Sequence, residues 1–291
     1  MLPSDEEVPA LVPGPGSLTW TRAADSRNLI AAGYALVLQV AHPVVGAGVA
    51  EHSDYTRHPW ERLFRTLDLT TALIYSDPAS AAAVARDLRA RHRQIRGKTR
   101  SGSSYHALEP DAYAWVWATL FGSIVAAHAR FGTPLQALQR EGFWTEWRLL
   151  GRLLGVRERD LPETLGGFDA YFDQMVRDVL EDNETVTGVI ASLRAPPAPS
   201  LLRYAAPVWR LGTLPGARML HLATVGLLPP ILRRRLGLSW TLAQECELRA
   251  FGVATRSLTP LMPRSLREFG PSYLRWRSSA GWPGASASSV R

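Results

Sequence analysis

The chain has 291 residues, of which 46% are hydrophobic and 20% are charged, and its formal net charge is +7. These values exclude an intrinsically disordered protein and supply a core for one large domain or two small ones. The single cysteine, Cys246, excludes an intramolecular disulfide and indicates a reducing, cytoplasmic compartment. No nucleic-acid-binding motif accompanies the basic charge, so we expect no nucleic acid among the partners.

The N-terminal segments predict a lead-in followed by buried helix. Residues 1–17 are acidic and proline-rich, which predicts an extended lead-in and not a signal peptide. Residues 21–41 predict a long buried helix. Polar residues and a proline interrupt the apolar stretch 29–50, which makes it unsuited to crossing a membrane. We expect the helix to break at Pro43.

Three long helices with clear end signals follow. Residues 59–75 open on a proline that suits the first turn. The next helix has its cap at Ser76 or Asp77 and its stop at Gly97, and a third spans residues 110–132. Further helices are expected at residues 140–154, 167–181, 183–195, 215–226 and 241–256.

These elements predict an all-α, multi-helical fold, because the alternation typical of strands is scarce. We expect a single helical domain over residues 18–270. The proline- and alanine-rich segment 194–200 is a candidate linker within it. Residues 271–291 are expected to form a flexible tail.

His92 is the first candidate for chemistry. Val84, Leu88 and Ile95 share its helix face, so the imidazole is expected to point to the apolar side. An imidazole there can donate a lone pair to a metal. The alternative, a core histidine bonded to a carbonyl, is favoured by periodicity alone. His128 raises the same question, and for it we favour an interaction with the end of its helix.

The second candidate is the cluster of Arg62, Arg65 and Thr66, which share a helix face. Two guanidiniums and a hydroxyl can hold propionates, a phosphate or a developing oxyanion. The alternative is a solvated charged face balanced by Glu61 and Asp68.

The third candidate is the adjacent pair Glu51 and His52, with His42 ten residues earlier. A buried glutamate with a raised pKa can serve as a general base. The alternative is a carboxylate at a helix end, paired with Arg57 or Arg62. The chain has no Glu-x-x-His, no His-Glu-x-x-His and no phosphate loop, so the common signatures of di-iron, zinc and nucleotide sites are missing.

Several segments together resemble the oxygenase family of the latex-clearing rubber oxygenase and the mycophenolic-acid pathway oxygenase. Residues 35–67, ALVLQVAHPVVGAGVAEHSDYTRHPWERLFRTL, resemble the signature block of that family. Later segments are also similar, namely RHRQIRGKTRSGSSYHALEPDAYAWVWATLF, EWRLLGRLLGV and GLLPPILRRRLGL. The resemblance extends from about Thr19 to about Glu268.

The resemblance implies a globin-like helical core that holds haem b, with dioxygen as co-substrate. It implies that His92 is the proximal iron ligand, which makes it the one metal-binding residue. It implies that Arg62, Arg65 and Thr66 form the distal cluster, and that Glu51 is the counterpart of a proposed base.

One position departs from the rubber oxygenase, which has a lysine where this chain has Arg65. A guanidinium stays protonated and is a very poor iron ligand. We therefore expect His42 or His52 to cap the iron, or else a distal position that is open or filled by water.

The expected function is that of a cytoplasmic, haem b-dependent oxygenase with a small apolar substrate, for which alkenes and isoprenoids are the candidates. The alternative is a non-catalytic helical protein that binds an apolar small molecule or docks at a membrane surface. The basic turn that carries Arg233–Arg235 motivates this alternative.

Overall fold

The computed structural model describes residues 3–53, 58–198 and 206–280. The elements of the first half are α1 (Val8–Leu11), α2 (Leu18–Ala23), η1 (Ser26–Ala31), α3 (Ala32–Val40), α4 (Pro43–His52), α5 (Pro59–Tyr75), α6 (Pro78–His92), β1 (Arg96–Lys98), β2 (Ser104–His106) and α7 (Pro110–Phe131). Those of the second half are α8 (Ala137–Leu153), η2 (Glu158–Asp160), α9 (Leu165–Gln174), η3 (Met175–Val179), α10 (Glu184–Arg194), α11 (Ala206–Leu227), α12 (Pro230–Arg235), α13 (Leu242–Leu258), η5 (Thr259–Leu261), α14 (Arg264–Arg267) and α15 (Phe269–Ala280).

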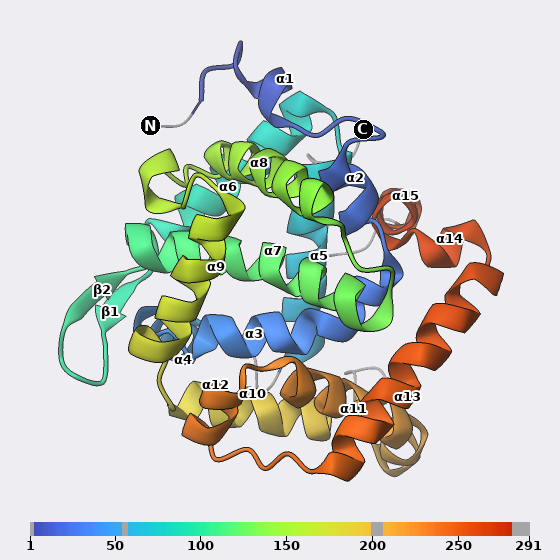
Figure 1. The fold of residues 1–291 in the computed structure, drawn as a ribbon. Coiled ribbons are helices and arrows are strands. Elements are labelled where there is room, and N and C mark those ends of the chain that lie inside the picture. Colours follow the sequence, from blue (N-terminus) through green and yellow to red (C-terminus); the bar gives the residue numbers. More distant parts are fainter. Residues whose placement is uncertain (1–2, 54–57, 199–205, 281–291) are drawn as a thin grey trace.

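The described residues contain fifteen α-helices and one two-stranded antiparallel sheet, which confirms the all-α class. Figure 1 shows α3 and α7 side by side across the middle of the molecule, with α8 above them and α10, α11 and α12 below. The short hairpin of β1 and β2 projects from one side. The globin-like arrangement expected for the core stays a prediction.

The first long helix is shorter than expected, because the helical path is interrupted and a new helical segment begins after Asp25. The Asp25 carboxylate accepts a hydrogen bond from the Arg27 backbone N–H and pairs with the Arg27 guanidinium, which caps a new turn, η1. The break at Pro43 is confirmed, since the axis bends by 102° between residues 26–40 and 43–52. The expected extended lead-in contains the short helix α1, whose Val8 and Leu11 are buried.

Helix α7 forms the centre of the core. The N–H groups of two of its indoles have carbonyl partners: Trp115 donates to Leu38 O at 2.9 Å, and Trp117 donates to Trp147 O at 2.9 Å. Trp147 returns the bond to Trp117 O, and these two rings stack at 4.5 Å. By length and composition α7 could cross a membrane, but 61% of its apolar window is buried within the protein, as expected of a core helix.

One main hydrophobic core includes residues from both sides of the candidate linker, among them Ile190 and Leu232. A smaller cluster around Phe131 and Leu248 joins α7 to α11 and α13. The linker itself begins where α10 ends at residue 194, and its last two residues lie outside the described residues.

Helices α5 and α6 form an antiparallel hairpin joined by a two-residue turn. The Asp77 side chain caps α6 by accepting from the Ser80 N–H, as predicted. The predicted stop at Gly97 is wrong: α6 ends at His92, and Gly97 lies in β1, where it pairs with Tyr105. The short hairpin therefore begins four residues after His92.

The expected tail begins too early, because residues 271–280 belong to α15. Arg277 of this helix is 3% exposed and pairs with the Asp68 carboxylate of α5 through two nitrogens. Tyr273 also donates to Asp68, at 2.8 Å. Two residues that read as unremarkable charges in the sequence thus hold the C-terminal helix against α5. Residues 281–291 lie outside the described residues.

We expect Arg277→Ala to destabilise the protein by about 3 kcal/mol, because it leaves Asp68 partly buried without its cation. Chemical denaturation measures the free energy of unfolding. Arg275→Ala, at an exposed position of the same helix, is the matched control and should change it by less than about 0.5 kcal/mol. Equal effects of the two substitutions would contradict this role of the ion pair.

Candidate functional site

The predicted site residues lie at three helix ends: the end of α4, the start of α5 and the end of α6. Arg62 lies thirteen residues before the end of α5, and His92 lies fourteen residues after the start of α6. Because the two helices are antiparallel, both residues lie at the open end of the hairpin. Arg62 also donates to Ser53 Oγ, directly after α4. The fold therefore brings Glu51, His52 and Arg62 together around the end of α4, and His92 ends α6 four residues before Arg96, whose carbonyl lies 3.0 Å from His52 Nε2.

Glu51 and His52 attach the β hairpin to α4. Tyr105 donates its hydroxyl to Glu51 Oε2 at 2.9 Å, and burial together with this carboxylate raises the pKa of Tyr105 to about 12. His52 Nε2 lies 3.0 Å from the carbonyl oxygen of Arg96. A Cβ at Gly97 would lie 2.1 Å from Glu51 Oε2 and 2.7 Å from the Tyr105 hydroxyl oxygen, so a larger residue there would displace these side chains. The expected burial of Glu51 is wrong, since its side chain is 52% exposed.

Arg65 and Thr66 lie on the exposed side of α5. Arg65 Nε donates to the Glu61 carbonyl at 3.3 Å, and the Thr66 hydroxyl donates to the Arg62 carbonyl at 3.1 Å. Both bonds stay within the helix, and within the part of the chain that the structure describes Arg65 makes no ion pair. Both side chains remain accessible to a charged group that approaches α5.

His92 has the contacts of a neutral imidazole with a defined orientation. Its Nδ1 lies 2.8 Å from the Leu88 carbonyl, and its ring meets the Tyr113 ring edge-on at 6.0 Å. Burial lowers the pKa of His92. The carbonyl assigns the proton to Nδ1 and leaves the lone pair on Nε2. This is the core-histidine alternative, and it is also the tautomer that a metal ligand requires.

His128 and His42 are both buried, but their ring nitrogens differ in hydrogen bonding. His128 Nε2 lies 3.2 Å from the Arg22 carbonyl. His42 Nδ1 has no hydrogen-bond partner among the described residues. His42 precedes α4, whereas Glu51 and His52 end it, and nine residues of helix span about 14 Å. His42 is therefore separated from the other predicted site residues of α4.

The charge around His92 is strongly positive. Residues 89–100 contain five arginines and one lysine and no acidic residue. Arg91 pairs with Asp87 at 2.6 Å, at the start of this segment. Such a segment favours anionic groups, including carboxylates of a ligand, close to the open end of the hairpin.

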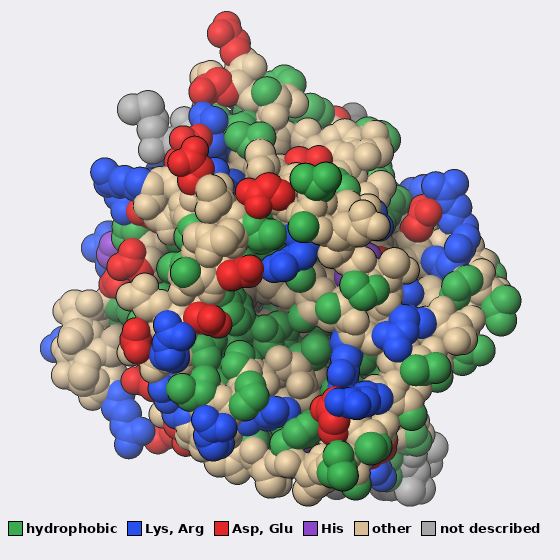
Figure 2. Space-filling model, in the orientation of Figure 1, with side chains coloured by type: hydrophobic (Ala, Val, Ile, Leu, Met, Phe, Trp, Pro, Cys, Tyr) green, Lys and Arg blue, Asp and Glu red, His purple; other side chains and the backbone are tan. Residues whose placement is uncertain are grey.

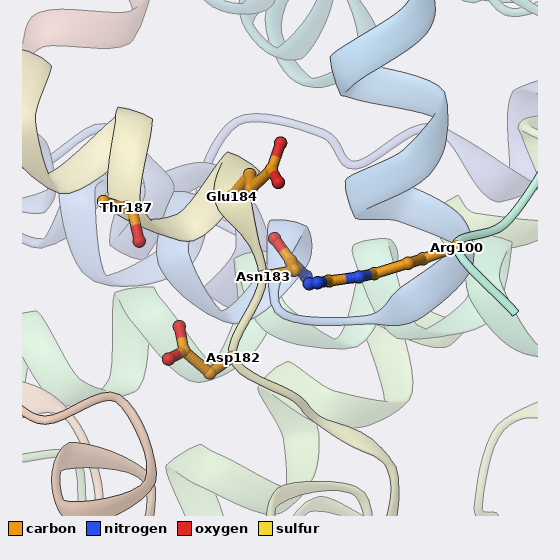
Figure 3. A pocket seen from close by; sticks show the side chains of 5 residues that line it. All are labelled: Arg100, Asp182, Asn183, Glu184 and Thr187. Carbon is orange, nitrogen blue, oxygen red and sulfur yellow. The ribbon is translucent and has the colours of Figure 1, made fainter.

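A polar pocket lies apart from the predicted residues. Figure 3 shows Arg100 of the hairpin loop extending toward Asn183 at the start of α10, and Asp182, Glu184 and Thr187 complete the lining. This lining suits a polar group and not an apolar substrate. In Figure 2 a hollow with mainly hydrophobic side chains lies over α3 and α7, between α9 and α13.

The basic turn that motivates membrane docking makes contacts within the protein. The Arg233 guanidinium lies over the Trp240 ring at 5.0 Å. Arg235 donates to the carbonyls of Val176 and Arg177, at 2.9 and 2.6 Å, and so holds the π-helical turn η3. Two of the three arginines are therefore engaged within the protein.

Comparison with known proteins identifies the family. The family described as "ER-bound oxygenase mpaB/B'/Rubber oxygenase, catalytic domain" matches residues 20–257. The chain belongs to this oxygenase family. Two uncharacterized proteins, from Mycobacterium bovis and Mycobacterium tuberculosis, are each 27% identical over 217 residues, which cover 72% of this chain and 80% of theirs. No solved structure matches the chain.

The family match confirms the resemblance and covers the predicted site residues of α4, α5 and α6. It supports an oxygenase activity in general terms. Among the described residues, no three His, Cys, Asp or Glu side chains form a metal-binding group. Ligation of haem iron by one histidine does not require such a group.

We expect the buried His42 to make the protein less stable in acid. Burial lowers the pKa of His42 to about 4, from 6.5, so the unfolded chain binds a proton that the folded chain excludes. Between pH 7 and pH 5 this should cost about 2 kcal/mol of unfolding free energy. His42→Gln should lose less stability over this interval. Denaturation curves at both pH values measure the difference, and parallel losses would contradict the assignment.

Proposed function

We propose that this protein is a haem b-dependent oxygenase, with His92 as the iron ligand and a small apolar substrate of alkene or isoprenoid type. The observation that carries the proposal is the orientation of His92 within an oxygenase domain. Its Nδ1 faces the Leu88 carbonyl at 2.8 Å, which leaves Nε2 as the free lone pair. Burial keeps the imidazole neutral, as ligation requires.

Haem, when bound, would supply the activation of dioxygen. The chain's own residues would bind and orient the haem and the substrate. Arg62, held by Ser53, and the accessible Arg65 can donate hydrogen bonds to propionates or to negative charge that develops nearby, and the exposed Thr66 hydroxyl can join them when it turns away from the Arg62 carbonyl. Arg65 stays protonated and is not proposed as a ligand.

Glu51 is proposed as the proton acceptor. Its side chain is half exposed and hydrogen-bonded to Tyr105, so the carboxylate is accessible while its position is held. Both candidate caps keep one ring nitrogen available: His52 contacts the Arg96 carbonyl through Nε2, and His42 has an unpartnered Nδ1. His42 and His52 therefore both stay candidates for the second ligand.

We expect haem-loaded wild-type protein to show a Soret band and His92→Ala to bind haem at least about tenfold more weakly. His106→Ala, at an exposed histidine of the hairpin, is the matched control and should bind haem like wild type. Titration of the apo protein with haemin gives both dissociation constants. An unchanged spectrum and affinity in His92→Ala would overturn the ligand assignment, and His42→Ala would then be the next variant.

We expect the haem-loaded protein to consume dioxygen when supplied with an unsaturated isoprenoid, and not with its saturated analogue. An oxygen electrode and mass spectrometry of the products measure this. Arg62→Ala should lower the turnover number at least about tenfold, since charge stabilisation on the distal side would be lost. A protein that stays colourless under adequate haem supply would favour the alternative, a non-catalytic protein that binds an apolar molecule.

A further inference from the structure

The corner formed by the end of α13, η5 and α14 displays large apolar side chains to solvent. Leu258, Leu261, Met262 and Leu266 are 59%, 81%, 39% and 57% exposed. Four such residues within nine positions form a concentrated patch, whereas single exposed apolar residues are ordinary. We call these four residues the apolar corner. All four follow residue 257, where the family match ends.

The apolar corner is held in place by the fold. The Thr259 side chain is buried, and its hydroxyl donates to the Thr255 carbonyl at 2.7 Å. The Met262 N–H donates to the Thr259 carbonyl at 3.0 Å, and α15 is anchored at Phe269, whose N–H donates to the Ala24 carbonyl at 2.7 Å. The leucines are therefore displayed by a fixed turn.

Arginines flank the apolar corner, and neighbouring glutamates balance part of their charge. Residues 248–267 contain four arginines and no acidic residue. Arg249 and Arg264 pair with glutamates that lie just outside this segment, at 2.8 Å each. Arg267 is exposed and has no ion pair among the described residues. Figure 2 shows hydrophobic side chains next to Lys and Arg side chains at this edge, on the right of the view.

We propose that the apolar corner docks on the surface of an anionic lipid bilayer. Leucine and methionine side chains would enter the boundary between headgroups and acyl chains, and the flanking arginines would meet the lipid phosphates. The corner is convex and lies at the edge of the molecule, where α13 gives way to α14 (Figure 1), so it can insert without rearrangement of the core. This docking does not depend on haem or on the proposed reaction.

The test is binding of the full chain to sedimented vesicles. Phosphatidylcholine vesicles and equimolar phosphatidylcholine–phosphatidylglycerol vesicles separate apolar insertion from charge attraction. We expect strong binding to the anionic vesicles only, weakened by added salt. The double variant Leu261→Ser/Leu266→Ser should lower the partition coefficient at least about tenfold. Arg267→Gln should lower it on anionic vesicles by a smaller factor, about fivefold.

The matched control is Leu138→Ser, because Leu138 is 87% exposed but lies at the start of α8, outside the corner. It should bind vesicles like wild type. Circular dichroism and thermal unfolding should be unchanged in every variant, since the substituted side chains are exposed. Equal binding of wild type and the double variant would overturn the proposal. So would a concentration-dependent dimer that the double variant abolishes, without any vesicle binding, because the corner would then join two copies of the chain.

Discussion

The structure depends on the burial of α7 and on a hydrogen-bond acceptor for each buried indole N–H. Placing Trp115 and Trp117 in the interior removes a large apolar area from water, but it also buries two N–H donors. The carbonyls of Leu38 and Trp147 accept these hydrogen bonds, and the bonds set α3 and α8 in register with α7. The same helix supplies Tyr113, against which the His92 ring lies. The orientation of the proposed iron ligand therefore derives from the core.

The predicted site is assembled at the open end of one helical hairpin. A two-residue turn joins α5 to α6, Arg62 and His92 lie in the parts of these helices farthest from that turn, and the Ser53 contact joins Arg62 to the end of α4. The β hairpin is then attached through Glu51 and Tyr105. The Ser53–Arg62 link is local, whereas the Glu51–Tyr105 link joins residues 54 positions apart and depends on packing. Helix α15, which lies beyond the end of the family match, contacts α5 through the ion pair of Arg277 with Asp68.

Burial sets the protonation state of three histidines. His42, His92 and His128 each have a pKa lowered by burial, so they are neutral near pH 7. They differ in what their nitrogens meet, which is a carbonyl for His92 and His128 and no partner for His42 Nδ1. A neutral imidazole with one defined donor is suited to ligation, and a buried one without a partner lowers stability in acid.

The sequence by itself determined the helical class, the break at Pro43 and the ends of α5 and α7, because proline, glycine and capping residues act within a few positions. It also indicated the family through its signature block. The tertiary structure alone decided which candidates meet. The strand alternation of Tyr105 between exposed Ser104 and His106 is too short to predict, yet it places that tyrosine on Glu51. The pairing of Asp68 with Arg277 joins residues 209 positions apart, and the inward contacts of Arg233 and Arg235 depend on Trp240 and η3. Such contacts follow from packing between distant segments, which local patterns do not encode.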